Sequence, residues 1–145
     1  MRLQDLPDNL TIPDGFALTS SRGLFTNHNG PVFAATAPDD LRSGMFVLDR
    51  HCNGMGFLHG GMASAFADRA LAVAVWDATK APSVTLKLSL HFYDTVPLHS
   101  WIEAVPEVYS ATNGVVQLGA EILIDGAVRV ARADATFRTV SRTKK

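Results

Sequence analysis

The sequence predicts an α+β domain in which a curved antiparallel β-sheet wraps around one long central α-helix. Residues 60 to 78 form an alanine-rich apolar run without proline, which favours a helix of about 18 residues. Residues 84 to 140 alternate apolar and polar side chains in segments joined by Asn-Gly and Asp-Gly pairs, a pattern typical of antiparallel strands and tight turns. Because the helix is apolar around nearly its whole circumference, we expect the sheet to enclose it.

Length and composition favour one globular domain. The chain has 145 residues, 47% of them hydrophobic, which is enough for a core. We expect residues 1 to 145 to form a single domain. Residues 1 to 20, with two prolines and no sustained period, are expected to be an irregular lead-in with at most one short helix, and residues 141 to 145 a solvated tail. A net charge of -1 argues against a nucleic-acid partner, which needs a basic surface.

Three features favour a cytoplasmic location without a membrane partner. The single cysteine, Cys52, excludes an internal disulfide and fits a reducing compartment. Residues 1 to 14 lack the basic and apolar regions of a secretory signal. The apolar run at residues 61 to 76 is interrupted by Asp68 and Arg69 and is shorter than the roughly 20 residues of a membrane span.

The part of the chain before the helix is expected to contain three strands. Residues 23 to 26 and 32 to 36 flank Asn29-Gly30, a pair that tolerates the positive φ of a hairpin turn. These two segments therefore predict a hairpin, and a third strand is predicted at residues 42 to 48.

The part after the helix is expected to form four strands. Residues 84 to 93 alternate strictly, so one face of this strand should be buried, and further strands are predicted at residues 100 to 111, 115 to 124 and 127 to 140. The turns between the last three strands are predicted at Asn113-Gly114 and Asp125-Gly126. The side chains expected on the buried face of the first of these strands are Val84, Leu86, Leu88, Leu90 and Phe92.

The helix is predicted to start at His59-Gly60-Gly61, and its first N–H groups are candidates for binding a developing negative oxygen. These groups lack partners within the helix and carry the positive end of its dipole. Glycine at this point lets a ligand approach the backbone closely. The alternative is that Gly54 and its neighbouring glycines serve only a cramped turn into the helix.

Asp68 is the charged residue that a buried helix does not need. It is either one half of a structural ion pair or a general base or nucleophile. Arg69 is excluded as its partner because adjacent side chains on a helix point apart. Gly60 and Asp68 are eight residues apart, hence about 12 Å along the helix axis, so one small reacting group cannot touch both. If both take part in one reaction, they must come from different subunits of a dimer.

The motif around these residues resembles that of the hotdog-fold acyl-CoA thioesterases of the PaaI-like (phenylacetate-degradation) type. The spacing is N-x-x-G-x-x-H-G-G, followed seven residues later by Asp, and the order of elements matches the family over residues 23 to 140. The resemblance implies a hotdog fold, dimers that often pair into tetramers, and an acyl-CoA substrate. The residues that carry it are Asn53, Gly56, His59, Gly60, Gly61 and Asp68.

The resemblance also implies a role for five residues. The Gly60 N–H and the Asn53 side chain would hold the thioester carbonyl, and Asp68 of the other subunit would activate water or attack directly. His59 would support the carbonyl-binding turn or the leaving thiolate, and Thr85 would help to orient the water. Two alternatives remain open, because Asn53 is also a common turn residue and Thr85 is also an ordinary strand residue.

Other candidates carry weaker predictions. Gly61, Phe57 and Met62 are expected to bind substrate, although Phe57 and Met62 equally suit the core. Cys52 lacks a well-placed base because adjacent His51 should point away from it. No metal or cofactor is expected, since the histidines and the cysteine have no zinc-site spacing. Four basic residues are candidates for contacts with CoA phosphates: Lys80, Lys87, Arg132 and Arg138.

The sequence therefore predicts an acyl-CoA thioesterase that acts as a homodimer or homotetramer. A non-catalytic hotdog module that binds or senses acyl-CoA is the alternative, and Asp68 counts against it because a binder needs no base. A hotdog dehydratase would need a His and acid pair on one substrate. His59 and Asp68 lie too far apart on one helix to form that pair, so the dehydratase hypothesis is less favoured than the thioesterase hypothesis.

Overall fold

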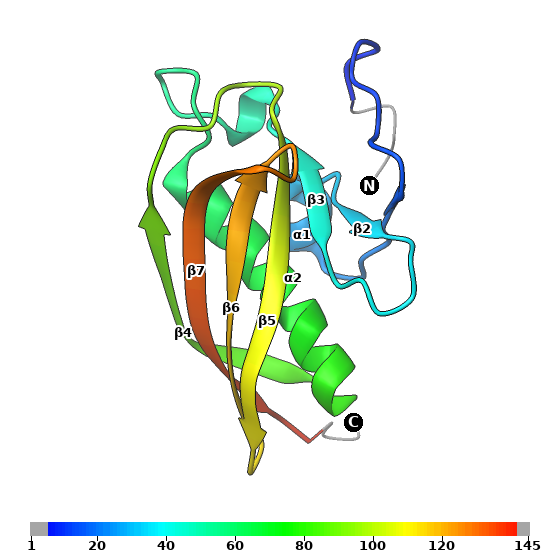
Figure 1. Cartoon of the computed structure of the whole chain (residues 1–145), viewed down its shortest axis with the longest axis vertical. Coiled ribbons are helices and arrows are strands. Elements are labelled where there is room, and N and C mark those ends of the chain that lie inside the picture. The colour runs from blue at the N-terminus through cyan, green and yellow to red at the C-terminus, as the bar shows by residue number, and fades with distance from the viewer. Residues whose placement is uncertain (1–5, 142–145) are drawn as a thin grey trace.

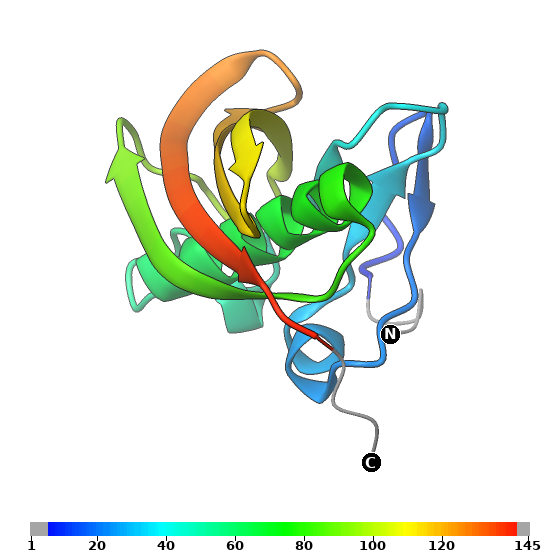
Figure 2. The ribbon, with the colours of Figure 1, turned by 90° about the horizontal axis from the view of Figure 1, so that it is seen from below.

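The computed structural model describes residues 6 to 141, and these form one antiparallel sheet curved around a long helix. Figures 1 and 2 show the helix in the concave side of the sheet, with the later strands passing across it. This arrangement confirms the predicted α+β fold class. The elements are β1 (Phe16–Leu18), α1 (Leu24–Asn29), β2 (Phe33–Ala35), β3 (Ser43–Phe46), the short 3-10 helix η2 (Asp49–His51), α2 (Gly60–Thr79), β4 (Ser83–Phe92), β5 (Trp101–Thr112), β6 (Val115–Ile124) and β7 (Val128–Thr139).

The sheet has the strand order β1-β2-β3-β5-β6-β7-β4, with every neighbouring pair antiparallel. Strands β5, β6 and β7 form the expected meander. Its two tight turns have positive φ at Asn113, Gly114, Asp125 and Gly126, as type I′ turns require. Strand β4 directly follows α2 in the chain but pairs with β7, so it forms one edge of the sheet.

The main core lies between α2 and the inner face of the sheet. One face of α2 is buried, and alternate residues of β6, such as Val116 and Leu118, are buried opposite it. The alternation of two residues predicted for β6 therefore places its buried face correctly, whereas α2 is buried on one face only. The buried side chains of α2 are Ala63, Phe66, Ala67, Ala70, Leu71, Ala74 and Val75.

The predicted hairpin around Asn29-Gly30 is wrong in its first half. Residues 24 to 29 form α1, in which the Asn27 N–H donates to the Gly23 carbonyl and the Asn29 side chain donates to the Phe25 carbonyl. Only the second half is a strand, β2. The segment is too short to show a periodicity, so its composition alone did not distinguish a helical turn from a strand.

The lead-in contributes more than the sequence indicated. Strand β1 pairs with β2, and residues 6 to 18 contribute apolar side chains to a second aromatic cluster, on the face of the sheet opposite α2. In this cluster the Phe16 and Trp101 ring centroids lie 5.1 Å apart. The outer face of the sheet is thus partly covered by the N-terminal segment, which the sequence left without a role.

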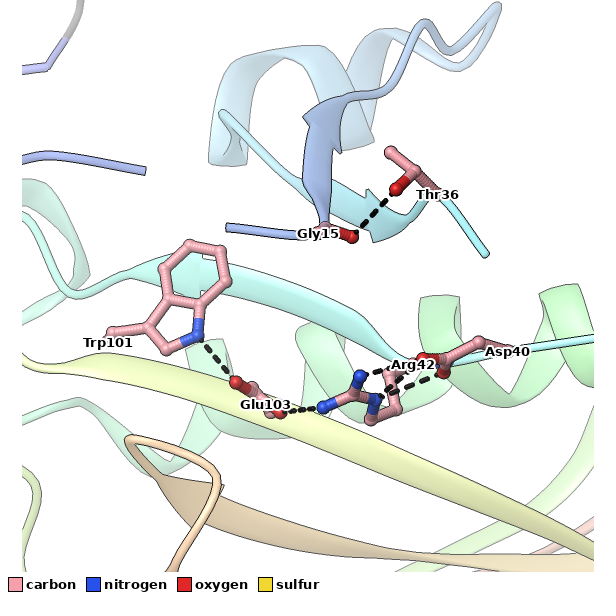
Figure 3. A network of polar contacts seen from close by, with 6 residues as sticks. All are labelled: Gly15, Thr36, Asp40, Arg42, Trp101 and Glu103. Atoms are coloured by element: carbon pink, nitrogen blue, oxygen red, sulfur yellow. Dashed lines mark hydrogen bonds and ion pairs between the residues drawn. The ribbon is translucent and has the colours of Figure 1, made fainter. Parts of the chain in front are cut away.

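A polar network closes the edge of this second cluster (Figure 3). The Trp101 Nε1–H donates to Glu103 at 2.9 Å, and the Arg42 guanidinium donates to the other Glu103 oxygen at 3.0 Å and to Asp40 at 2.7 Å. The hydrogen bond from Arg42 holds the pKa of Asp40 below its usual value. Glu103, although buried, is therefore fully paired.

Two predictions fall partly outside the described residues. These are the irregular lead-in, for residues 1 to 5, and the solvated tail, for residues 142 to 145.

Candidate active site

The turn before α2 is held together by the side chain of Asn53. Its Oδ1 accepts the backbone N–H groups of Met55 at 2.9 Å and Phe57 at 3.3 Å. Since Oδ1 must be the acceptor, the amide orientation is fixed and Nδ2 keeps both of its protons. No residue among 6 to 141 accepts a hydrogen bond from Nδ2 in the structure. Asn53 is therefore both a turn residue and a free donor.

The start of α2 is capped by a histidine ring. The Nδ1 atom of His59 accepts the Gly61 N–H at 2.9 Å, and the His59 carbonyl accepts the N–H groups of Met62 and Ala63. Nδ1 is then unprotonated and Nε2 carries the proton of the neutral ring. Of the first four N–H groups of the helix, that of Gly60 alone has no acceptor in the described chain.

Gly60 and Asn53 line the same cavity, which has a volume of about 270 Å³. The cavity penetrates between the start of α2 and the sheet. Its wall beside the helix start is the Phe92 ring, whose Cζ would lie 3.6 Å from a Cβ built on Gly60. The two residues that carry the free donors therefore line one cavity with mostly apolar walls. The other lining residues are Met55, Phe57, Leu58, Ala63, Asp94, Thr95, Val96, Ile122, Val130 and Ala131.

Asp68 lies two turns further along α2 and contacts the edge strand β4. Its Oδ1 accepts the Thr85 hydroxyl at 2.6 Å, while Oδ2 has no partner among residues 6 to 141. No described Lys or Arg pairs with Asp68, and Arg69 donates instead to Ser43 and Thr19. The structural ion pair considered from the sequence is thus not formed within the described part of the chain.

A β-bulge directs Thr85 toward Asp68. The register of β4 against β7 shifts between Thr85 and Lys87, so that Thr85 lies opposite the buried Phe137 while Lys87 lies opposite Thr136. Strict alternation would instead have placed Thr85 and Lys87 on the same face. The extra residue at Leu86 therefore turns Thr85 to the helix side of the sheet.

The predicted buried face of β4 is only partly buried, which corrects the sequence prediction. Val84, Leu86 and Phe92 are 48%, 58% and 52% exposed, whereas Leu88 and Leu90 pack against the core. The cause is the position of β4 at the edge of the sheet, together with the change of face at the bulge.

The helix is also less enclosed than predicted. The residues at positions 61, 65, 68, 72 and 76 share one stripe of α2, and none of them is buried. Asp68 is accordingly half-buried, and Trp76 is 54% exposed. Asp68 does not line the cavity of Gly60 and Asn53. One chain thus holds two separate groups of candidate site residues.

The predicted substrate-binding residues fall in different places. Phe57 lines the cavity, whereas Gly61 and Met62 do not. Met62 instead lines a small cavity between α1 and α2, and the Gly61 N–H already donates a hydrogen bond to the His59 ring. That Ile122 and Ala131 line the cavity could not be predicted from the sequence, because the strand register decides which apolar strand residues lie near the helix start.

Cys52 is poorly suited to be a nucleophile. Its thiol donates to the Leu48 carbonyl, and burial raises its pKa, which keeps it protonated. His51 is buried with Nδ1 accepting the Leu48 N–H, and burial lowers its pKa. Within residues 6 to 141 there is no group of three or more His, Cys, Asp or Glu residues that could hold a metal ion.

The four basic candidates for CoA contacts differ in their partners. Arg132 binds Glu121, Asp134 and Tyr109, and Lys80 pairs with Asp77. Neither Lys87 nor Arg138 has an ion-pair partner in the described chain. Lys87 and Arg138 are thus the more available of the four cations.

No helix in the described residues has both the length and the apolar character needed to cross a bilayer.

The chain belongs to the thioesterase superfamily, whose family model matches residues 55 to 131, just over half of the chain. This confirms the family predicted from the motif. A comparison with curated protein sequences gave no match.

Solved structures of thioesterases share the fold. The E. coli PaaI protein of the phenylacetic acid degradation operon superposes with a TM-score of 0.65 at 20% identity, over 69% of this chain and 72% of that chain. Zebrafish thioesterase superfamily member 2 gives a TM-score of 0.64 at 19% identity, over 68% and 73%. A thioesterase from Streptococcus pneumoniae TIGR4 with coenzyme A gives 0.65 at 17% identity, over 71% and 82%. The predicted hotdog fold is thereby confirmed.

Proposed function

We propose that this protein hydrolyses acyl-CoA thioesters to a free acid and CoA. The observation that carries the proposal is that Gly60 and Asn53, each with a free donor in the described chain, line one mostly apolar cavity. Membership of the thioesterase superfamily supports the reaction type. The coenzyme A in the S. pneumoniae relative supports CoA as the carrier.

The two donors suit a thioester carbonyl. When the carbonyl carbon is attacked, its oxygen becomes negative, and preorganised N–H groups stabilise that charge without rearranging. The dipole of α2 adds to this stabilisation because Gly60 is at its positive end. His59 acts indirectly, since its ring fixes the first turn and leaves the Gly60 N–H as the available donor.

Asp68 is the proposed base or nucleophile. Its free Oδ2 can accept a proton from water, whose oxygen then bonds to the carbonyl carbon, or can itself attack that carbon. In both routes the carbon–sulfur bond breaks and the CoA thiolate leaves, taking up a proton to become the free thiol. After direct attack the acyl group remains on Asp68 as a mixed anhydride, which a water molecule must then hydrolyse to release the acid and restore the carboxylate. Thr85 holds the other carboxylate oxygen and so fixes the direction of Oδ2.

Asp68 is proposed to serve the cavity of a second chain. It is about 12 Å from Gly60 along α2, and it lies on the uncovered stripe of the helix. The stripe includes Gly61, which has no side chain, and Ala65 and Ala72, whose side chains are small, so that another copy could approach closely. An isologous dimer would bring each Asp68 to the partner's donors. Pairing of such dimers into a tetramer stays a prediction.

The first experiment offers a panel of acyl-CoAs to the protein and detects released thiol with a thiol-reactive dye. We expect thiol release with at least one acyl-CoA. The alternative, a binding or sensing module, predicts a raised melting temperature with acyl-CoA but no thiol. That second result would contradict the proposed hydrolysis.

The second experiment mixes two inactive variants, Asp68→Asn and Asn53→Asp, after unfolding and refolding them together. If the site combines two chains, heterodimers contain one intact site, and the mixture should recover about a quarter of the wild-type rate. If each site uses residues of one chain, the mixture stays inactive. An inactive mixture whose heterodimers are verified would therefore contradict the shared site.

A further inference from the structure

The cavity beside Gly60 has an apolar floor. Ala63 of α2, Ile122 of β6 and Ala131 of β7 are each at most 3% exposed, and they line its inner part. The donors Gly60 and Asn53 lie at its accessible side, where both residues have solvent contact. A carbonyl held by these donors would thus have one substituent in the cavity and the other outside it.

The apolar floor suits an acyl group better than the pantetheine arm of CoA. Pantetheine carries two amides, and burying an amide without hydrogen bonds is unfavourable. The inner side chains Ala63, Ile122, Val130 and Ala131 offer no donor or acceptor. A hydrocarbon group loses no hydrogen bonds in this cavity, and its transfer out of water is favourable.

The size of the cavity limits the group that it accepts. An apolar cavity of roughly 150 Å³ is enough to bind benzene. The present cavity, at about 270 Å³, holds a single ring or a short chain and is below the range of roughly 300 to 1,000 Å³ typical of drug-sized ligands. A long fatty acyl chain would have to extend beyond it.

The charge at the cavity mouth limits the group further. Asp94 is the one ionisable residue among the cavity-lining residues, and its Oδ1 accepts the Thr95 N–H at 2.7 Å. No Lys or Arg lines the cavity to pair with a carboxylate. An acyl group that ends in a carboxylate would therefore lose hydration and meet a like charge.

We infer that this cavity is an acyl pocket selective for uncharged apolar acyl groups of the size of a single ring or a short chain. The inference rests on the proposed function and specifies its substrate class. In this inference, Ala63, Ile122 and Ala131 at the floor of the cavity select the acyl group by size and polarity, and Asp94 at the mouth selects against negative charge.

The test measures kcat/KM for acetyl-, hexanoyl-, benzoyl-, palmitoyl- and succinyl-CoA. We expect hexanoyl- and benzoyl-CoA to exceed palmitoyl- and succinyl-CoA by about tenfold or more. Turnover that favours palmitoyl- or succinyl-CoA would overturn the inference and leave the proposed hydrolysis standing. No turnover with any of the five would contradict the proposed function itself.

The variant Ala131→Leu fills the pocket from the sheet. We expect the ratio of kcat/KM for hexanoyl-CoA to that for acetyl-CoA to fall about tenfold. An equal decrease for both substrates would overturn the inference, because it would indicate that pantetheine occupies the cavity. An unchanged ratio would also overturn it. Ala63→Leu fills the same space from α2 and serves if Ala131→Leu does not fold.

Melting temperature provides a readout independent of turnover. Ala133, two residues along β7, is fully buried and does not line the cavity. Ala133→Leu should lower Tm by about 5 °C through overpacking, whereas Ala131→Leu should not, because the cavity accommodates the larger side chain. Equal losses in the two variants would contradict the presence of the cavity.

The variant Asp94→Asn isolates the charge at the mouth. Asparagine keeps the Oδ1 acceptor for the Thr95 N–H, so the local turn is retained. We expect the ratio of kcat/KM for succinyl-CoA to that for hexanoyl-CoA to rise about fivefold. A ratio that does not change would remove Asp94 from the selection.

Discussion

The turn before α2 and the open stripe of the same helix differ in how far one chain completes them. In the turn, Asn53 and His59 each accept backbone N–H groups, and what remains is two oriented donors. On the stripe, Thr85 is the one hydrogen-bond partner of Asp68 among residues 6 to 141, and Trp76, two turns further along the helix, is 54% exposed. The comparison teaches that residues close in sequence can build the proposed carbonyl-binding half of the site, whereas the proposed base lies on a surface that the described chain leaves open.

Removing the proposed base should have the largest effect. Asp68→Asn keeps an oxygen to accept the Thr85 hydroxyl but cannot act as a base, so kcat should fall by about 10²- to 10⁴-fold. Thiol release under saturating acyl-CoA measures this change, and the melting temperature should stay close to that of the wild type.

The matched control is Asp77→Asn, on the same helix, which removes an exposed pair with Lys80. Its kcat should not change. Near-normal turnover of Asp68→Asn would leave the stripe without a catalytic role.

The next largest effect is expected at Asn53, where two roles can be separated. Asn53→Asp keeps Oδ1 for the Met55 and Phe57 N–H groups but removes the free Nδ2 donor and adds a negative charge beside the carbonyl. Steady-state kinetics should show a loss of about 10²- to 10³-fold in kcat.

Asn53→Ala loses the turn contacts as well. Its free energy of unfolding, measured with denaturant, should decrease by about 1 to 2 kcal/mol, while that of Asn53→Asp should change less. If Asn53→Asp retained full activity, Asn53 would be a turn residue alone.

A smaller loss is expected when a methyl group is added at the helix start. A Cβ on Gly60 would lie 3.6 Å from the Phe92 ring, an ordinary contact, so Gly60→Ala should fold normally. The methyl group would obstruct the approach of the carbonyl and lower kcat/KM by about tenfold or more.

Gly54→Ala is the control, because a Cβ there meets nothing within 4 Å. Gly54 belongs to the same turn and does not line the cavity. Equal kinetics for the two alanine variants would mean that ligands do not approach Gly60.

The smallest effect concerns the stability of the turn region against acid. Burial lowers the pKa of His51 in the folded protein below its value near 6.5 in the unfolded chain. At a pH between these two values, the unfolded chain binds a proton at His51 more readily than the folded protein does. The free energy of unfolding should therefore decrease as pH falls below about 6.5, by at most about 1.4 kcal/mol per pH unit from this residue.

Denaturant unfolding between pH 7.5 and pH 5 measures this slope. In His51→Asn the Oδ1 can still accept the Leu48 N–H but no proton is taken up, so this part of the slope should disappear. An identical pH dependence in the variant would assign the acid sensitivity to other groups.

The sequence predicted the parts of the fold that have a long, regular pattern. The 20 residues of α2 and the strands β5 to β7 were predicted within two residues of their ends because many side chains repeat the same period and the turn pairs favour positive φ. The helix α1 and the strand β1 were missed because they have six and three residues, too few for a period to be visible.

The candidate site was predicted unevenly for a related reason. The positions of Asn53, His59 and Gly60 at the start of α2 follow from their spacing, because these residues interact within one turn. The contact of Thr85 with Asp68 depends on a bulge that alternation does not predict. Which apolar residues line the cavity depends on the pairing of β6 and β7.

By itself, then, the sequence determined the long helix, the strand meander and the local geometry that leaves Gly60 with a free N–H. These features depend on residues that are neighbours in the chain. The tertiary structure alone decided that β4 lies at the sheet edge, that Thr85 faces Asp68, and that Ala63 and Ala131 share a cavity. These features depend on contacts between segments distant in the chain, and such contacts are set by strand order and register.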